Sequence, residues 1–483
     1  MNMNLATNNS MQEDCLVANI YAPDTDETNL PVVVYVHGGA YQVGFGNWLT
    51  PKTLVQSKRI VAVTFNYRLG VHGFLCLGTE DAPGNAGMKD QVALLRWVKK
   101  NIAEFGGNPN DVTIDGYSAG SSSVDLLMLS ESTKGLFHKV IPESGANVGV
   151  WSVQIDPVEN AKIYAKALNF SNVDDIYALE EFYKTASIEL LLTDTFMDRY
   201  DSTFLFSPCV ERETRKEVFL KEAPVDILKR GKYRKFPVLY GFANMEGLIR
   251  ALYFNNWKDR MNEKFSDFLP ADLQFENEEQ KEELAKSIKK FYFDDKPVLN
   301  ETFVAYINYF SDVMFTYPTL RSVKLQVEAG SDSIYLYEYS FVDNFVSRLV
   351  NLPEFKDYFK DINLDSVSGA NHCAQTWALL DDNNLFVIPN EIVSDDTEKM
   401  RSLMRELWLN FMTTGKPVPK GSSLPDWPSV GADWSPHMSL GKNIKLGGSL
   451  LPERARFWDA IYEKHYRTPA PPPPPRARRY NEL

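Results

Sequence analysis

The chain has 483 residues, of which 44% are hydrophobic and 24% are charged, and this is the composition of an ordinary globular protein. Its net charge of −13 makes nucleic acid and anionic membrane surfaces poor partners. The sequence contains no apolar run of about 18 residues, which excludes a transmembrane anchor. Residues 1–14 lack the apolar stretch of a signal peptide, so the sequence as it stands predicts a cytoplasmic location.

Short apolar runs alternate with helical patterns along the first part of the chain. The runs at 31–36 and 59–65 are continuously apolar, as expected of parallel strands covered on both faces. A helix is expected at 90–105, followed by strands at 112–117 and 139–141, and this alternation predicts an α/β fold with a mainly parallel sheet. Further strands are expected at 16–21, 236–240 and 333–339, and helices at 157–168, 173–192, 278–291, 301–312, 317–329, 397–414 and 451–462.

A Gly-x-Ser-x-Gly pentapeptide at 116–120 lies between a β-branched run and a run that can form a helix. This is the context of a nucleophile elbow, a tight turn that exposes a serine hydroxyl, here that of Ser118. A side chain at Gly116 or Gly120 would collide with the neighbouring strand or helix. Because the bare pattern also occurs by chance, the assignment of Ser118 depends on whether the partners of a nucleophilic serine follow in the right order.

A serine hydroxyl needs a base within hydrogen-bond reach and an acid that orients the base. After such an elbow the acid and then the histidine follow the serine along the chain, which leaves His372, His437 and His465 as candidates. His372 is favoured because it follows a loop of small residues and precedes a helical run, where a catalytic imidazole can be placed. His437 lies in a polar, irregular stretch, and His465 lies near a proline-rich tail.

Two glutamates compete for the role of the acid. Glu246 follows the expected strand at 236–240 after a short loop, and functional groups gather at the carboxyl edge of a parallel sheet. Glu143 also follows a strand, but it stands only a short distance beyond Ser118, with no helix between them. Glu246 is therefore the preferred acid.

An oxyanion site needs backbone N–H groups aimed at the developing negative charge. Ala119 supplies the N–H group after the nucleophile, and Gly39 and Ala40 supply others from the loop that follows the strand at 31–36. A Gly-Gly pair after a strand is also common in plain turns. Neither a metal nor an organic cofactor is expected, and the cysteines at 15, 76, 209 and 373 have no C-x-x-C spacing, which predicts neither a disulfide framework nor a zinc site.

The last residues, 467–483, are rich in proline and arginine and are expected to form a disordered tail. They contain a P-x-x-P-x-R spelling that can dock in an SH3-like groove, so a weak contact of this type is the alternative to a solvated tail.

Taken together, the chain resembles the type-B carboxylesterase and cholinesterase family, and its invertebrate esterases most closely. The resemblance implies an α/β-hydrolase fold with large helical insertions over residues 11–466, acting on a small-molecule ester. It implies a Ser118–Glu246–His372 triad, oxyanion donors at Gly39, Ala40 and Ala119, and supporting or pocket residues at Gly38, Tyr117, Ser144 and Trp151. Ser144 would support the acid, and Trp151 would wall the acyl pocket. The motifs that carry the resemblance lie at 13–16, 36–41, 66–70, 73–75, 82–85, 87–91, 95–98, 105–109, 116–120, 144–145 and 241–247.

The sequence departs from the family pattern at three places. Tyr117 stands where the family usually has glutamate, and Cys373-Ala374 stands where an acidic pair usually follows the histidine. The family also has several dozen further N-terminal residues, which predicts either a trimmed cytoplasmic variant or a truncated product of a secreted or ER-lumenal protein. Two alternatives to an active esterase follow: a non-catalytic adhesion or binding member of the family, and a poorly folded truncated product.

Overall fold

The computed structural model describes residues 13–192, 199–342, 367–382 and 393–475. Its centre is a nine-stranded sheet in the order β1-β4-β2-β5-β6-β7-β8-β10-β11. The strands from β4 to β10 run parallel, and β1 and β11 close the two edges in antiparallel pairs. The strands are β1 (Ala18–Tyr21), β2 (Leu30–Val36), β4 (Val61–Phe65), β5 (Gly107–Tyr117), β6 (Lys139–Glu143), β7 (Val238–Ala243), β8 (Ile334–Tyr339), β10 (His437–Leu440) and β11 (Ile444–Gly447).

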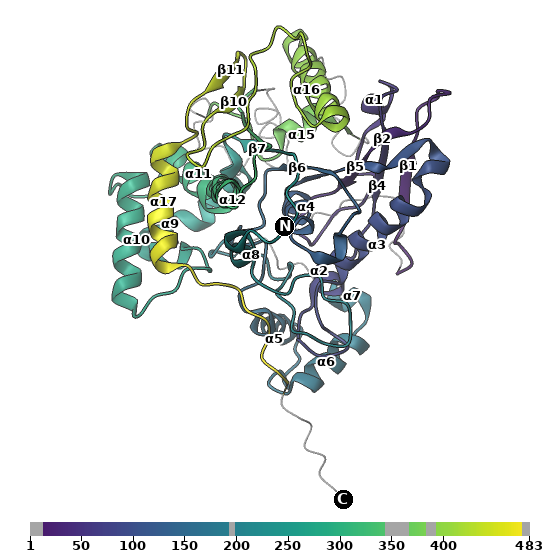
Figure 1. Ribbon diagram of the computed structural model, residues 1–483. Helices are drawn as coiled ribbons and strands as arrows, with labels where there is room; N and C mark the ends of the chain where they lie inside the picture. The colour runs from purple at the N-terminus through teal and green to yellow at the C-terminus, as the bar shows by residue number, and fades with distance from the viewer. Residues whose placement is uncertain (1–12, 193–198, 343–366, 383–392, 476–483) are drawn as a thin grey trace, which may run out of the picture.

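The central strands are apolar on both faces because helices cover both. In β2, Val32 and Val34 enter one core while Val33 and Tyr35 enter the other, as the two-residue period of a strand requires. The second core also contains residues of α1, α15 and α16, whereas α3, α4 and α12 contribute to the first (Figure 1). The predicted α/β class with a mainly parallel sheet is thus confirmed.

The helices follow the expected segments with shifted ends. The expected helix at 173–192 is split in two, and the segment between 303 and 328 is one run whose middle, Asp312–Thr316, is a π-helix. A short pair of strands, β3 (Leu49–Thr50) and β9 (Asp381–Asp382), was not expected. The helices are α1 (Lys52–Val55), α2 (Gly70–Phe74), α3 (Ala86–Asn101), α4 (Ala119–Leu127), α5 (Pro157–Ala167), α6 (Ile176–Thr185), α7 (Ile188–Leu191), α8 (Pro224–Arg230), α9 (Phe254–Glu263), α10 (Glu278–Phe293), α11 (Phe303–Ser311), α12 (Tyr317–Glu328), α15 (Ala374–Leu379), α16 (Asp395–Thr414) and α17 (Pro452–His465).

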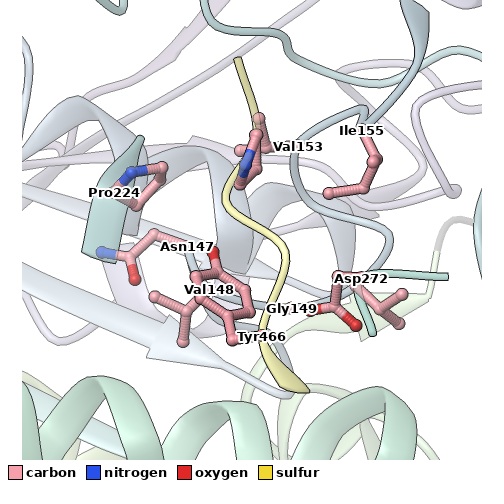
Figure 2. A pocket seen from close by; sticks show the side chains of 10 residues that line it. Asn147, Val148, Gly149, Val153, Ile155, Pro224, Asp272 and Tyr466 are labelled. Atoms are coloured by element: carbon pink, nitrogen blue, oxygen red, sulfur yellow. The ribbon is translucent and has the colours of Figure 1, made fainter. Parts of the chain in front are cut away.

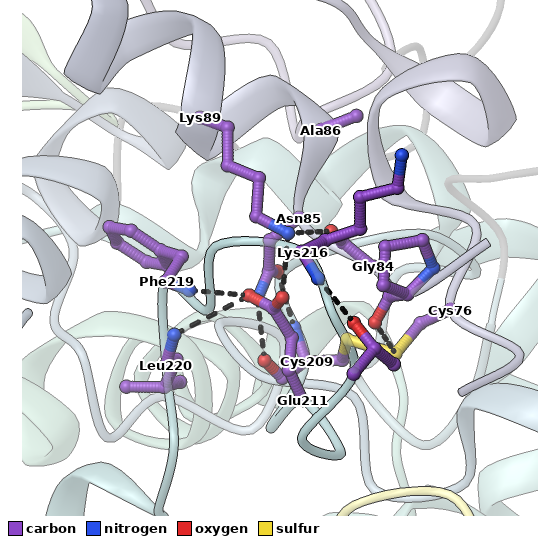
Figure 3. Close-up of polar contacts among 12 residues, drawn as sticks. Cys76, Gly84, Asn85, Ala86, Lys89, Cys209, Glu211, Lys216, Phe219 and Leu220 are labelled. Carbon is purple, nitrogen blue, oxygen red and sulfur yellow. Dashed lines mark hydrogen bonds and ion pairs between the residues drawn. A yellow bond between two sulfur atoms is a disulfide. The ribbon is translucent and has the colours of Figure 1, made fainter. Parts of the chain in front are cut away.

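One disulfide corrects the expectation drawn from the cysteine spacing. Cys76 and Cys209 form a disulfide although they are 133 residues apart in the sequence (Figure 3). No local sequence pattern predicts a pair at this separation. Beside the disulfide the buried Glu211 carboxylate accepts hydrogen bonds from Lys89 Nζ at 2.6 Å and Asn85 Nδ2 at 2.7 Å. These contacts join the loop after α2 to the segment before α8. Cys15 and Cys373 are free.

The proline-rich segment also differs from the expectation. Residues 467–475 run along the body of the protein (Figure 1), and Figure 2 shows the chain passing between Pro224, Val153 and Asp272. Pro469 and Pro472 are buried, while Pro471, Pro473 and Pro474 are exposed. Residues 476–483 lie outside the described residues. None of the helices in the described part of the chain combines the length and apolarity that crossing a membrane requires.

Candidate active site

Ser118 lies at the sharp turn between β5 and α4. Its backbone has φ 57° and ψ −121°, a conformation that L-residues rarely adopt. The turn is held by a hydrogen bond from Ser118 N to Glu143 O at 2.9 Å, and it is tight enough that a Cβ atom at Gly116 would lie 2.2 Å from Gly120 O. The two glycines of the pentapeptide are therefore required by contact between backbones, and the strained turn presents the serine side chain beyond the end of the strand.

His372 reaches Ser118 from a loop that precedes α15. Its Nε2 atom lies 2.9 Å from Ser118 Oγ. The loop is fixed from the end of β7: Ala370 N donates to Asn244 Oδ1 at 2.8 Å, and Met245 N donates to Ala370 O at 3.0 Å. The histidine side chain is 11% exposed and Glu246 is fully buried, so the imidazole can meet a substrate while its carboxylate partner is shielded from solvent.

Glu246 stands on the other side of the imidazole. Its Oε2 atom accepts a hydrogen bond from His372 Nδ1, and its Oε1 atom accepts one from Ala243 N at 2.8 Å. The carboxylate is fully buried. With Nδ1–H donating to the carboxylate, Nε2 carries the lone pair that faces the serine hydroxyl. This is the arrangement in which an imidazole can take a proton from a serine.

The competing candidates lie elsewhere. Glu143 makes its side-chain hydrogen bonds to Thr376 and Trp408 rather than to a histidine. His437 begins β10, so its stretch is a strand and not irregular, and His465 ends α17. The structure therefore brings together the side chains of Ser118, His372 and Glu246, whereas the side chains of Glu143, His437 and His465 have other partners.

The loop at 37–41 lies directly beside the nucleophile. A Cβ atom on Gly38 would be 2.9 Å from Ser118 Cβ, so only glycine permits this approach. Gly39 and Ala40 both have positive φ, 107° and 55°, which turns the loop sharply after β2. His37 anchors it: the ring stacks on Tyr67 at 4.3 Å, and burial lowers the pKa of His37 to about 4, so it stays neutral. The loop that contains Gly39 and Ala40 thus lies beside Ser118, which Ala119 follows at the start of α4.

Aromatic side chains pack next to the histidine. Trp151 is buried, donates from Nε1 to Met314 O at 2.7 Å, and packs against Phe204 and Phe315 at ring distances of 5.3 and 5.7 Å. Phe315 in turn contacts the His372 ring at 4.3 Å. Sequence reasoning named Trp151 but missed Phe315, which lies in the π-helix. Such π-bulges often occur at functional sites, but periodicity alone does not reveal them.

The structure describes the contacts of Ser144 and Tyr117, which the resemblance gave as supporting residues. Ser144 Oγ accepts a hydrogen bond from Gln375 Nε2 at 2.6 Å, so it contacts α15 rather than Glu246. Tyr117 packs its ring against the loop at 37–41, where its Cδ2 atom would lie 3.0 Å from a Cβ atom on Gly38. Burial raises the pKa of Tyr117, and the nearby Cys373 adds to this, so the phenol is neutral and does not replace the charge of a glutamate. Among the described residues, no group of three or more His, Cys, Asp or Glu side chains is placed to hold a metal ion.

A parallel sheet that carries a serine at a nucleophile elbow, with a histidine and a carboxylate arriving from later strands, defines the α/β-hydrolase class. The family model described as "Carboxylesterase family" matches residues 1–458. The chain therefore belongs to the carboxylesterase family, and it is a carboxylic-ester hydrolase.

Two esterases among the relatives agree with this assignment. The chain is 32% identical to Esterase FE4 of Myzus persicae over 86% of its own length and 72% of that protein. Juvenile hormone esterase from Manduca sexta, solved with OTFP covalently attached, superposes with a TM-score of 0.81 at 27% identity, over 95% of this chain and 86% of that one. Neuroligin-2 of Mus musculus is 28% identical over 93% of this chain and 56% of its own length.

Proposed function

We propose that the protein hydrolyses small-molecule carboxylic esters through an acyl-enzyme on Ser118. His372 Nε2 takes the proton of Ser118 Oγ as this oxygen attacks the ester carbonyl, and the N–H groups of Gly39, Ala40 and Ala119 receive the oxyanion. The alcohol leaves with the proton from His372. Water then attacks the acyl group with His372 again as the base, and this step releases the acid and restores the serine.

One observation carries the proposal. A single imidazole lies 2.9 Å from a strained serine at one nitrogen and is bound to a buried carboxylate at the other. Glu246 stabilises the positive charge that forms on His372 when the proton moves. The three residues are separated by 126 and 254 positions along the chain, so their contact requires the whole sheet.

The test is hydrolysis of p-nitrophenyl butyrate by the full-length chain and its variants. Ser118→Ala and His372→Ala should each lower kcat by about 10⁴-fold or more. His437→Ala is the matched control and should keep the wild-type rate. An organophosphate should leave its adduct on Ser118, and peptide mapping that finds the adduct on another residue would contradict the assignment.

The non-catalytic alternative has less support. A binding member of the family is expected to have lost the serine or the histidine, and this chain retains both in contact. A wild-type protein that melts cooperatively but hydrolyses no p-nitrophenyl ester would favour this alternative over the esterase.

The proline-rich segment offers a separate, second role. Pro469 and Pro472 are buried against the body, whereas Pro471 and Pro474, which carry the P-x-x-P spelling, are exposed. We propose a weak contact of this outward face with an SH3-like aromatic groove. A panel of SH3 domains should bind the full chain, and Pro471→Ala with Pro474→Ala should abolish the binding, while Thr468→Ala should not.

The disulfide bears on the compartment. Disulfides form and persist in oxidising environments and are rare in the cytosol, so the Cys76–Cys209 bond supports the secreted or ER-lumenal alternative. Alkylation of the denatured protein purified from its native source should label two cysteines before reduction and all four afterwards. Four labelled cysteines before reduction would support the cytoplasm instead.

A further inference from the structure

Glu143, at the end of β6, is fully buried and has no role in the mechanism above. Its Oε1 atom accepts a hydrogen bond from Trp408 Nε1 at 2.6 Å, and its Oε2 atom accepts one from Thr376 Oγ1. Thr376 belongs to α15, the short helix that begins two residues after His372, and Trp408 belongs to α16. The carboxylate therefore joins the end of a central strand to two of the helices that cover this face of the sheet, α15 and α16.

The backbone of the same residue contacts the nucleophile. Ser118 N donates to Glu143 O at 2.9 Å. The main chain of Glu143 thus contacts the turn that holds Ser118, and its side chain contacts the helix that follows His372. Its neighbour adds a parallel contact, since Gln375 Nε2 of α15 donates to Ser144 Oγ at 2.6 Å.

These contacts complete the support of the histidine loop. The N-terminal side of the loop is fixed by Asn244 and Met245 after β7, and its C-terminal side is fixed by Glu143 and Ser144 after β6. The carboxyl ends of two adjacent parallel strands therefore hold the loop from both sides. Without the second support, the N-terminal turn of α15 would lose its hydrogen bonds to the end of β6, and a small shift of this helix would move His372.

The residues around Glu143 indicate that burying this acid is unfavourable for the free energy of folding. Asp115 Oδ2, Tyr35 Oη and Tyr337 Oη are buried nearby and lack hydrogen-bond partners among the described residues. Burial raises the pKa of Glu143 to about 7, and the Glu143 charge adds to the effect of burial in raising the pKa of Asp115. Ionising a second buried carboxyl group next to Asp115 costs folding free energy, so the contacts of Glu143 with Thr376 and Trp408 are formed against this cost.

We infer that Glu143 is a positioning residue, whose carboxylate sets the place of α15 and thereby the distance between His372 Nε2 and Ser118 Oγ. The inference rests on the proposed function. A misplacement of a reacting group by about 1 Å costs on the order of 10²-fold in rate, so a small shift of α15 is enough to be measured.

The experiment compares the two ends of the Glu143–Thr376 contact in the full-length protein. Glu143→Ala and Thr376→Val should each lower kcat for p-nitrophenyl butyrate by about 10- to 100-fold, with KM within about threefold of wild type. The double variant should lose no more kcat than the single variant with the larger loss, because each single substitution removes the same contact. Thr376→Ser and Glu143→Gln keep a hydrogen-bonding group at each position and should restore kcat to within about threefold of wild type.

Trp408→Phe is the matched control. It removes the other hydrogen bond of the same carboxylate without touching α15, so it should lower the melting temperature but leave kcat within about threefold of wild type. An equal loss of kcat in Trp408→Phe and Thr376→Val would overturn the inference, because the effect would then be one of core stability. Full kcat in Thr376→Val would overturn it as well. Failure of the proposed function is distinguishable, since the wild-type chain itself would then be inactive and unlabelled by an organophosphate at Ser118.

Discussion

Cys373 Sγ lies 3.4 Å from His372 Nε2, the same nitrogen that faces Ser118 Oγ at 2.9 Å. The cysteine has a left-handed backbone with φ 61° and is 4% exposed. Burial raises the pKa of the thiol, and the charges of Glu246 and Glu143 raise it further. The thiol therefore stays protonated and acts as a second, weak hydrogen-bond donor to the nitrogen that accepts the serine proton.

Cys373→Ala should relieve this competition. A thiol is a weak donor, so we expect kcat/KM for p-nitrophenyl butyrate to rise by no more than about fivefold. Cys373→Ser, which keeps a donor in the same place, should stay at or below the wild-type rate. A fall of more than about tenfold in the alanine variant would show that the thiol assists the histidine rather than competing for it.

Glu246→Gln should lower kcat far more than the loss of one negative charge would by itself. Ala243 N donates to Oε1 of this residue, so the amide oxygen of glutamine will occupy that place and its NH₂ group will face His372 Nδ1. The imidazole then carries its proton on Nε2 and cannot accept one from Ser118. We expect kcat to fall by about 10³- to 10⁴-fold with an unchanged circular dichroism spectrum. Glu104→Gln on the surface serves as the control, and a loss below about tenfold in Glu246→Gln would refute the tautomer argument.

Trp151→Ala should widen the acyl side of the site. The ring is buried between Phe204 and Phe315, so its removal leaves a cavity and should cost about 3–5 kcal/mol of stability. If the pocket lies here, the ratio of kcat/KM for p-nitrophenyl hexanoate to that for the acetate should rise by about tenfold or more. Trp458→Ala removes an equally buried tryptophan from α17, and there the ratio should not change. An equal hexanoate-to-acetate ratio of kcat/KM in Trp151→Ala and Trp458→Ala would mean that the acyl group does not bind next to Trp151.

Glu143 should also give the protein a measurable pH dependence of stability. Burial raises its pKa from 4.5 to about 7, so the folded state binds this proton more tightly than the unfolded chain. Its contribution to stability is then complete below about pH 4.5 and is lost as pH rises towards 7. Asp115, Tyr35, Tyr337, Thr376 and Trp408 surround the group, and none of them is cationic.

Glu143→Gln has no such proton to lose. Its melting temperature relative to wild type should therefore increase between about pH 5 and about pH 8. Parallel thermal melts of the variant and the wild type across this pH interval measure the difference in melting temperature. For Glu104→Gln the difference from wild type should not change with pH. A difference that is flat or falls with pH for Glu143→Gln would mean that the folded protein does not hold this proton.

The amino-acid sequence determined the class of fold because its signals are local. Continuous apolar runs at 31–36 and 59–65 mark strands buried on both faces, and these became β2 and β4. The pentapeptide at 116–120 likewise fixed the elbow, since Gly116 and Gly120 touch neighbouring backbone. The order of serine, acid and histidine along the chain left three candidate histidines. The loop of small residues before His372 then favoured that histidine, and the position of Glu246 after a strand favoured it over Glu143.

Only the tertiary structure decided what these residues touch. The Cys76–Cys209 bond, the contact of Phe315 with His372, and the link from Glu143 to Thr376 join positions far apart in sequence, and no local period records them. The same holds for the buried face of residues 467–475, because composition indicates a polyproline conformation but not the surface against which it packs. Such contacts depend on how the sheet and its covering helices meet, and this is set by packing across the whole chain.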